Sequence, residues 1–506
     1  MSLAEPVSRT LSLHRPSAGR AVLVTSYMTG STSGKNLGIA GYSYDMVARL
    51  FLPLLARWGE VIPVPHPRLQ LEQAAEKSRR RGLEPLHVSF LPLQDVFLPA
   101  SVPNVVVPAW EYPDVPNHAF DGNPQNDWPA TADRCAMLLV GGPFTVEALR
   151  RAGTKAPVRI VQVPTPEDYF AISPWDPAKR TTLPWPALVF PQPPTPEPQP
   201  ITLPLRADPM AQKPPARGLK RVGKAIERVV RNAFKAVVGP KVYQRLVHPL
   251  QRSWQSAWQN LHDWEPPQAR VRQFDLSGVV YTSILNPRDG RKNWQDLITG
   301  FLCALGDRED ATLVIKLITS DPRAIATIVQ YYVNRDIPHR CKLIFLSGYL
   351  TERQLLELAE ASTYYLHTTK AEGNCLPLMN YMAAGRPGIS PVHSAISDYF
   401  DRTVGLAVES HPEPCAWPHD RRLRIRTTWN RLVWPSLVAQ IRASYEIAKQ
   451  DRAAYDAFAT RSRERMRLWA SPEQVWRRLE AALDAAAAGQ ELRQAPFPAL
   501  ERKAAA

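Results

Sequence analysis

Glu372 is a carboxylate in a position suited to chemistry on a bound ligand. It follows Tyr364–Thr368, a short apolar run that is typical of a buried parallel strand. Gly373 allows a backbone turn that residues with a β-carbon resist, and Pro377 suits the first turn of a helix. Ligands of open α/β sheets bind at the carboxyl ends of the strands, where free helix amides favour phosphate oxygens. A carboxylate beside such an anion site would hold the hydroxyl groups of a sugar.

The segment EGNCLPLMNYMAAGRPGI, which begins at Glu372, resembles the EGxGLPxxEAMAxGxPV signature of retaining family 4 glycosyltransferases with the GT-B architecture. The resemblance implies that Glu372 faces the donor sugar. Asn380 stands where the family has a second glutamate that holds the ribose diol. An amide has one acceptor oxygen and no charge, so it cannot give a diol the same paired bonds. The backbone amides that would take the diphosphate belong to Gly373, Asn374, Cys375 and Leu376.

An alternative interpretation of this segment is a strand, turn and helix that only pack together, with Glu372 as a helix cap. In the resembling family, an arginine and a lysine ahead of the first helix of the second domain neutralise the leaving diphosphate. Lys292 matches the lysine, but the arginine position falls near Ser283. Arg288 or Arg291 would therefore replace the missing arginine from an altered loop.

The resemblance also assigns two loops away from Glu372. Gly348 and Tyr349 belong to the loop that would receive the nucleotide base. Glu111 follows a predicted strand of the first domain and is expected in the cleft, although a structural loop contact is the alternative. His118 lies six residues beyond a predicted strand and could act as a base towards the acceptor, or could be an ordinary loop histidine.

A glycine-rich loop follows the first predicted strand, Ala21–Tyr27. It contains Gly34, Lys35 and Gly38, but the spacing does not fit the Walker phosphate-binding motif. Such a loop also resembles the GT-B amino-terminal domain, where it lines the cleft between the domains on the acceptor side. A plain flexible loop is the alternative.

Composition limits the class of protein. The 506 residues suggest two or three domains, and 44% hydrophobic content is ordinary for a soluble chain. The five cysteines show no metal-ligand spacing, which predicts no structural zinc and a reducing compartment. No apolar core of a signal peptide and no run of about 18 apolar residues occurs, so we expect a cytoplasmic protein. A net charge of +15 calls for an anionic partner.

Most of the excess charge lies in one segment. The composition changes at a proline-rich run, residues 175–200, which predicts an extended linker and no folded element. Residues 213–252 then carry eleven Lys or Arg against one acid, with apolar residues at helical spacing and three tryptophans downstream. A basic amphipathic helix of this kind predicts binding of residues 213–264 to an anionic membrane surface. Nucleic acid, an acidic partner protein and simple packing on a domain are the alternatives, and we expect no nucleic acid.

The sequence thus predicts an α/β GT-B architecture, with two Rossmann-like doubly wound domains facing a cleft. The expected function is retaining, metal-independent transfer of a sugar from a nucleotide-diphosphate sugar to a glycan or lipid-linked acceptor in surface polysaccharide synthesis, without a cofactor. A non-catalytic GT-B binding module and a sugar-nucleotide epimerase are the alternatives. The expected parts are a disordered amino terminus (1–20), an acceptor-side domain (21–170), the linker and basic insertion (171–270), a nucleotide-sugar domain (271–420), helices that cross back (421–490) and a frayed tail (491–506).

Overall fold

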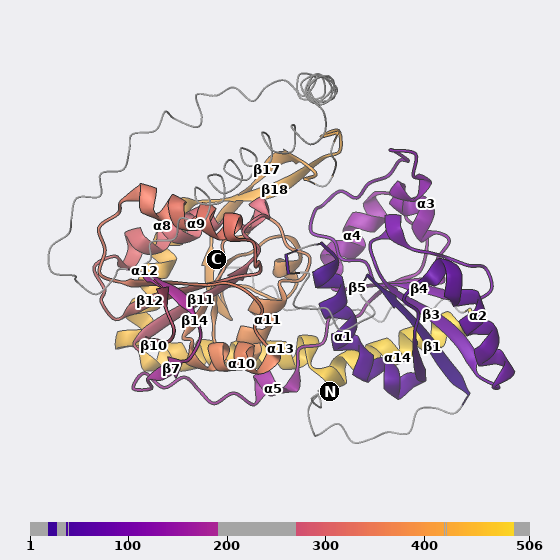
Figure 1. The fold of residues 1–506 in the computed structure, drawn as a ribbon, viewed down its shortest axis with the longest axis horizontal. Coiled ribbons are helices and arrows are strands. Elements are labelled where there is room, and N and C mark those ends of the chain that lie inside the picture. The colour runs from indigo at the N-terminus through magenta and orange to yellow at the C-terminus, as the bar shows by residue number, and fades with distance from the viewer. Residues whose placement is uncertain are drawn as a thin grey trace, which may run out of the picture.

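The computed structural model describes residues 19–27, 37–38, 40–190, 270–418, 420 and 422–489. These residues form two α/β lobes that lie side by side, each built on a largely parallel sheet (Figure 1). Gly34, Lys35 and the basic segment 213–264 fall outside the described residues, so the membrane-binding helix stays a prediction.

The first lobe contains a six-stranded parallel sheet in the order β2-β1-β3-β4-β5-β6. The run RAVLVTS is buried along almost its whole length, because helices cover both faces of a parallel sheet. The strands are β1 (Arg20–Ser26), β2 (Glu60–Pro63), β3 (Glu84–Phe90), β4 (Asn104–Val106), β5 (Met137–Val140) and β6 (Val158–Ile160). The helices are α1 (Ala40–Trp58), α2 (Pro67–Arg80), α3 (Trp128–Ala132), α4 (Pro143–Arg151) and α5 (Glu167–Phe170).

The second lobe contains an eight-stranded sheet in the order β16-β15-β14-β11-β12-β13-β8-β9. Six of these strands are parallel, and β8 (Ala187–Phe190) and β9 (Arg270–Val271) add an antiparallel edge. The parallel strands are β11 (Val279–Leu285), β12 (Ala311–Leu317), β13 (Lys342–Leu346), β14 (Tyr364–Leu366), β15 (Gly388–Pro391) and β16 (Gly405–Val408). The helices between them are α8 (Trp294–Leu305), α9 (Pro322–Arg335), α10 (Glu352–Ala361) and α11 (Leu376–Ala383).

The chain order of the second sheet reverses beside β11. The chain runs from β11 through β12 to β13 on one side, and then returns to β14 on the other side. The carboxyl ends of β11 and β14 therefore border a topological switch point, which is where ligands of open α/β sheets bind.

The prediction of an extended linker without a folded element is wrong for the described residues after 175. These residues contain β7 (Thr181–Leu183) and β8 (Ala187–Phe190). β8 pairs with β13 on one side and with β9 on the other, so it lies one strand in from the edge of the sheet. The neighbouring prolines flank β8 and do not fall within it. After β16, the strands β17 (Ser410–Ala416) and β18 (Arg426–Leu432) form a hairpin.

The chain crosses back to the first lobe through its last helices. They are α12 (Trp434–Gln450), α13 (Arg452–Ala470) and α14 (Pro472–Ala488), and the last two run along one side of both lobes (Figure 1). Val475, Trp476 and Leu479 of α14 pack in the core of the first lobe. None of the helices within the described ranges combines the length and the hydropathy that a bilayer crossing requires.

Candidate functional site

Glu372 lies in the loop between β14 and α11, at the switch point of the second lobe. Its backbone N–H donates to the Ser394 hydroxyl at 2.9 Å, and its carbonyl accepts from the Ala395 N–H at 3.2 Å. The loop after β11 is joined to it, because the Arg291 carbonyl accepts from the Lys370 N–H at 2.7 Å. The two loops that end β11 and β14 are therefore held as one unit.

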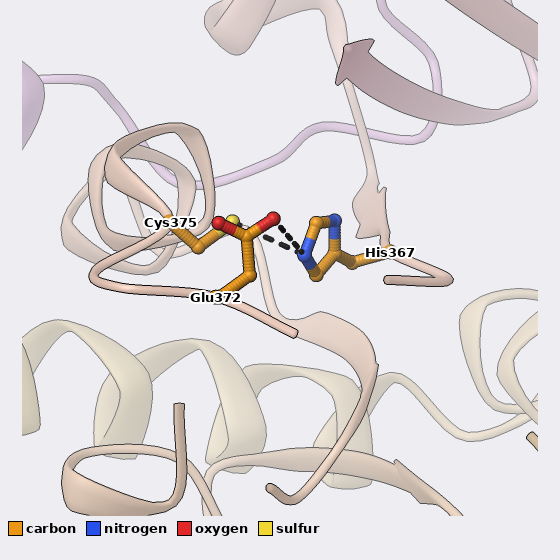
Figure 2. A group of neighbouring side chains, drawn as sticks. All are labelled: His367, Glu372 and Cys375. Carbon is orange, nitrogen blue, oxygen red and sulfur yellow. Dashed lines mark hydrogen bonds and ion pairs between the residues drawn. The ribbon is translucent and has the colours of Figure 1, made fainter. Parts of the chain in front are cut away.

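Two cations and a histidine surround the Glu372 carboxylate. Lys292 Nζ donates to Oε1, and Arg291 Nη1 lies 3.2 Å from Oε2. His367 Nε2 lies 3.3 Å from Oε1, as the dashed line in Figure 2 shows. We call Glu372, Lys292, Arg291 and His367 the Glu372 cluster. The structure thus brings Glu372 and Lys292 together with Arg291, which is one of the two arginines that the sequence offers in place of the family's arginine.

Glu372 and His367 are buried, Arg291 and Lys292 are partly buried, and the two cations set the protonation of Glu372. Burial alone would raise the pKa of the Glu372 carboxyl, but Lys292 and Arg291 outweigh burial and hold that pKa well below its ordinary value. Burial lowers the pKa of His367, although its hydrogen bond to Glu372 acts in the opposite direction. Glu372 is therefore ionised and His367 neutral at neutral pH.

Arg291 also connects the two lobes. Its Nε lies 3.0 Å from Asp289 on its own loop and 3.4 Å from Glu111 of the first lobe. Burial would lower the pKa of Arg291, but Glu111 and Glu372 outweigh burial and raise it. Glu111 thus reaches the cleft, where the sequence places it, and its contact there is a cation of the other lobe.

The first lobe approaches the Glu372 loop so closely that glycines are needed. A β-carbon on Gly141 would lie 2.0 Å from Asn374 Oδ1, and one on Gly142 would lie 2.1 Å from Asp398 Oδ2. The N–H of Phe144, at the start of α4, donates to the same Asp398 oxygen at 3.2 Å. These contacts show that the lobes meet over the amino terminus of α11.

One group of side chains has the residue types of a metal site. His367, Glu372 and Cys375 place a nitrogen, an oxygen and a sulfur within 4.8 Å of one another (Figure 2). Burial raises the pKa of the Cys375 thiol, so the sulfur carries its proton at neutral pH. A divalent ion at this point would also have to displace the ammonium and guanidinium groups that Glu372 already binds. The three residues therefore fit a metal poorly.

The donor-side residues differ in how they relate to the cluster. Arg288 is exposed and pairs with Asp321, so Arg291 is the arginine that reaches Glu372. Gly348 lies in the loop after β13, where its φ of 88° suits glycine. Tyr349 beside it is 42% exposed. The pKa of Tyr42 in the first lobe is raised mainly by burial, and the second cause is the electrostatic effect of Tyr349. This loop therefore faces the first lobe across the cleft.

The acceptor-side residues are only partly placed. Gly38 meets the second lobe, because its carbonyl accepts from Asn286 Nδ2 at 2.9 Å and a β-carbon would lie 2.6 Å from the Ile318 carbonyl. His118 is exposed, and its ring lies 5.7 Å from that of Phe120. The described contacts of His118 do not reach the Glu372 cluster.

The helix residues after Glu372 have their own partners. Cys375 at the start of α11 has a φ of 53° and gives no side-chain cap. Leu376 packs against the cores of both lobes. Asn380 lies near the phenol of Tyr169 in α5, and it partly offsets the rise that burial causes in the pKa of that phenol. The amide at the position of the family's second glutamate thus lies beside a side chain of the protein itself.

Sequence reasoning missed several residues of the site. His367 directly follows β14, and its place at a strand end was the available signal. Asp289 contacts Arg291, which lies only two residues further along the same loop. Ser394 and Asp398 begin and end a short 3-10 helix, and only the fold brings Ser394 to Glu372 and Asp398 to Phe144 of the first lobe. Residue spacing along the chain does not indicate these last two contacts.

Comparisons with known proteins show the fold. No family model and no curated protein matches the chain. The structure of sucrose-phosphate synthase from Thermosynechococcus elongatus is similar with a TM-score of 0.50 and 12% identity, over 93% of this chain and 100% of that chain. HepE (Alr3699) of Anabaena, in complex with UDP and glucose, gives 0.47 and 10%, over 92% and 100%. A point mutant of TarM from S. aureus gives 0.42 and 9%, over 79% of this chain and 55% of that chain.

The structural neighbours are GT-B glycosyltransferases. At these identities the likeness concerns the fold and says nothing of the substrate. The predicted fold class is confirmed, because the chain has two doubly wound α/β lobes arranged as in the GT-B architecture.

Proposed function

We propose that this protein is a glycosyltransferase that moves a sugar from a nucleotide-diphosphate sugar to a glycan or lipid-linked acceptor. The observation that carries the proposal is the meeting of Glu372, Lys292 and Arg291 at the switch point of a GT-B sheet. A carboxylate there suits sugar hydroxyls, and two cations beside it suit a diphosphate.

Each residue of the cluster has a distinct task in this proposal. Glu372 accepts hydrogen bonds from the donor sugar and orients it. Lys292 and Arg291 exchange part of their contact with carboxylates for the diphosphate, and neutralise the negative charge that grows as the nucleotide leaves. The amide groups at the start of α11 add partial positive charge at the same place. The acceptor enters from the first lobe, on the side of Glu111 and Gly38.

The finer parts of the function are further proposals. We propose retention at the anomeric carbon on the resemblance of the Glu372 segment alone. We propose a metal-independent reaction, because Lys292 and Arg291 can neutralise the diphosphate without a divalent ion. We also propose a cytoplasmic location, binding of residues 213–264 to an anionic membrane and a role in surface polysaccharide synthesis, and the composition of the chain supports these proposals.

A second candidate is a GT-B module that binds a glycan or a partner without turnover. Two observations favour it: Asn380 stands in place of an expected carboxylate and lies near Tyr169, and the charge of Glu372 is already balanced by Lys292 and Arg291. The two candidates differ in whether a nucleotide sugar is bound and consumed.

The test is thermal unfolding of the purified protein against UDP, GDP, ADP, CMP and dTDP sugars, with Lys292→Ala beside the native chain. A ligand that binds the folded state raises the midpoint by an amount set by its concentration relative to Kd. We expect one nucleotide class to raise the unfolding midpoint. In Lys292→Ala the shift should correspond to binding that is at least about tenfold weaker, because this variant lacks a cation that would contact the phosphate. Lys370→Ala, outside the cluster, is the control. No shift with any nucleotide sugar would favour the binding module.

A further inference from the structure

A second buried arginine lies at the opposite edge of the same sheet. Arg386 directly precedes β15 and is 1% exposed. Gly278, which precedes β11, and Ala361, which precedes β14, border the same place. This is the amino-terminal edge of the sheet, whereas the Glu372 cluster lies at the carboxyl-terminal edge.

Arg386 meets carbonyl oxygens but no carboxylate. Nη1 donates to the Ala384 carbonyl at 3.1 Å, and Nη2 donates to the carbonyls of Ser173 and Glu360 at 3.0 and 3.1 Å. Within the described part of the chain, Nε has no hydrogen-bond partner. Burial lowers the pKa of Arg386, because little negative charge offsets the lost hydration. Arg386 is therefore a buried cation that has no carboxylate partner among the described residues, and such a cation is suited to an anion.

This arginine lines a cavity of about 230 Å³. The volume is below the roughly 300–1,000 Å³ of sites for drug-sized ligands, so the ligand must be small. Three residues that carry hydroxyl groups, Ser173, Thr181 and Ser277, also line the cavity, together with Lys179 and several apolar residues. We call this place the Arg386 cavity.

Two acids also line the cavity, and each has a partner. Glu360 pairs with Lys179 at 2.7 Å, and both side chains are more than 40% exposed. Asp176 accepts from the Ala178 N–H at 2.9 Å. The charge of Glu360 is therefore balanced by Lys179 at the surface, and Arg386 remains the cation without a counter-charge inside.

We propose that the Arg386 cavity binds a small phosphate monoester that carries hydroxyl groups, such as a sugar phosphate. The guanidinium donates to the phosphate, and the hydroxyls of Ser173, Thr181 and Ser277 contact the remainder of the ligand. The segment Ser173–Asp176 continues the chain from the first lobe, so the bound ligand braces the connection between the lobes. The site is an effector site and does not depend on the function proposed for the Glu372 cluster.

The test measures thermal unfolding of the full chain with glucose 6-phosphate, glycerol 3-phosphate and inorganic phosphate at millimolar concentration. We expect a phosphate ester to raise the midpoint by about 3–5 °C when its concentration is about 100 times Kd. Inorganic phosphate is expected to bind more weakly, because it lacks the part that contacts the hydroxyls.

Two variants, each with a control variant, test whether the ligand binds in the cavity. Ser277→Asp adds a negative charge to the lining and should weaken binding of the phosphate ester at least about tenfold. The similar but neutral Ser277→Asn should weaken this binding less than about threefold. Arg386→Met should abolish the shift. Arg463→Met is its control, because Arg463 also donates to the Ala384 carbonyl and to the neighbouring Ile172 carbonyl, but does not line the cavity.

Three outcomes would overturn the proposal. The first is no shift of the native chain with any of the three compounds. The second is equal weakening of ester binding by Ser277→Asp and Ser277→Asn, which would show that the charge of the cavity lining does not affect binding. The third is loss of the shift in Lys292→Ala, which would place the phosphate in the Glu372 cluster. If Arg386→Met does not fold, the pair of Ser277 variants decides.

Discussion

The second lobe buries two arginines at opposite edges of one sheet, and their surroundings differ in charge. Arg291 lies among the carboxylates of Glu111, Asp289 and Glu372, which together raise its pKa despite burial. Arg386 lies among carbonyl oxygens, and burial lowers its pKa. The first arginine has its charge balanced by the protein, and the second does not.

This difference predicts two kinds of ligand binding. A donor that enters at Arg291 must compete with carboxylates, so it has to bring comparable negative charge, as a diphosphate does. A ligand at Arg386 meets a cation that pairs with no carboxylate among the described residues, so it does not have to displace an acid. The first site is suited to selecting a highly charged substrate, and the second to holding a small anion.

The largest expected effect comes from removing the charge of Glu372 while keeping its shape. Glu372→Gln should lower turnover about 1,000-fold, or about 4 kcal/mol, because the amide holds the donor sugar more weakly and leaves Lys292 and Arg291 bound differently. Stability should also fall, by about 3 kcal/mol, because the variant leaves buried cations with less counter-charge. Initial rates with the donor found by thermal unfolding, and a urea titration, measure both.

Glu360→Gln is the matched control for this variant. Glu360 pairs with one lysine at the surface near the Arg386 cavity, and exposed pairs contribute about 1 kcal/mol or less. We expect its turnover to stay within about twofold of the native value. Unchanged turnover in Glu372→Gln would remove Glu372 from the mechanism.

A smaller effect should separate the two arginines by stability. Arg291→Met leaves three carboxylates without their shared cation and should cost about 3–5 kcal/mol. Arg386→Met removes an unbalanced charge but leaves carbonyl groups without donors, and should cost about 1–3 kcal/mol. Urea unfolding of the two variants compares them directly. If the two variants lost equal free energy of unfolding, or if Arg386→Met lost more, the proposed difference in charge balance between the two arginines would be contradicted.

The sequence predicts the fold and much of the Glu372 cluster because local signals suffice there. A β-prone run, a glycine turn and a helix start are consecutive in the chain, and they position Glu372. Lys292 and the glycine-rich region around Gly38 likewise follow strand ends. The choice between Arg288 and Arg291 needed the loop geometry, which turns one to Asp321 and the other to Glu372.

Long-range packing explains what the sequence could not show. Prolines around β8 indicate a linker locally, but pairing with β13 and β9 makes β8 a strand of the second sheet. Arg386 lies in the same helix end as Gly385, and its sequence context indicates only a turn. Its cavity forms from the chain connection at Ser173 and the amino-terminal ends of strands, which are far apart in sequence.

The smallest expected effect is the dependence of stability on acid pH. The pKa of Glu372 is lower in the folded chain than in the unfolded chain, where it is about 4.3, so its contribution is complete above that pH and is lost as pH falls through the folded pKa. Each pH unit in this window contributes at most about 1.4 kcal/mol. Urea unfolding from pH 6 to pH 3 should therefore show a smaller loss in Glu372→Gln than in the native chain. The free energy of unfolding of Arg386→Met should change with pH in parallel with that of the native chain, because an arginine does not titrate between pH 6 and pH 3. A native-like acid slope in Glu372→Gln would mean that Lys292 and Arg291 do not hold this carboxylate ionised.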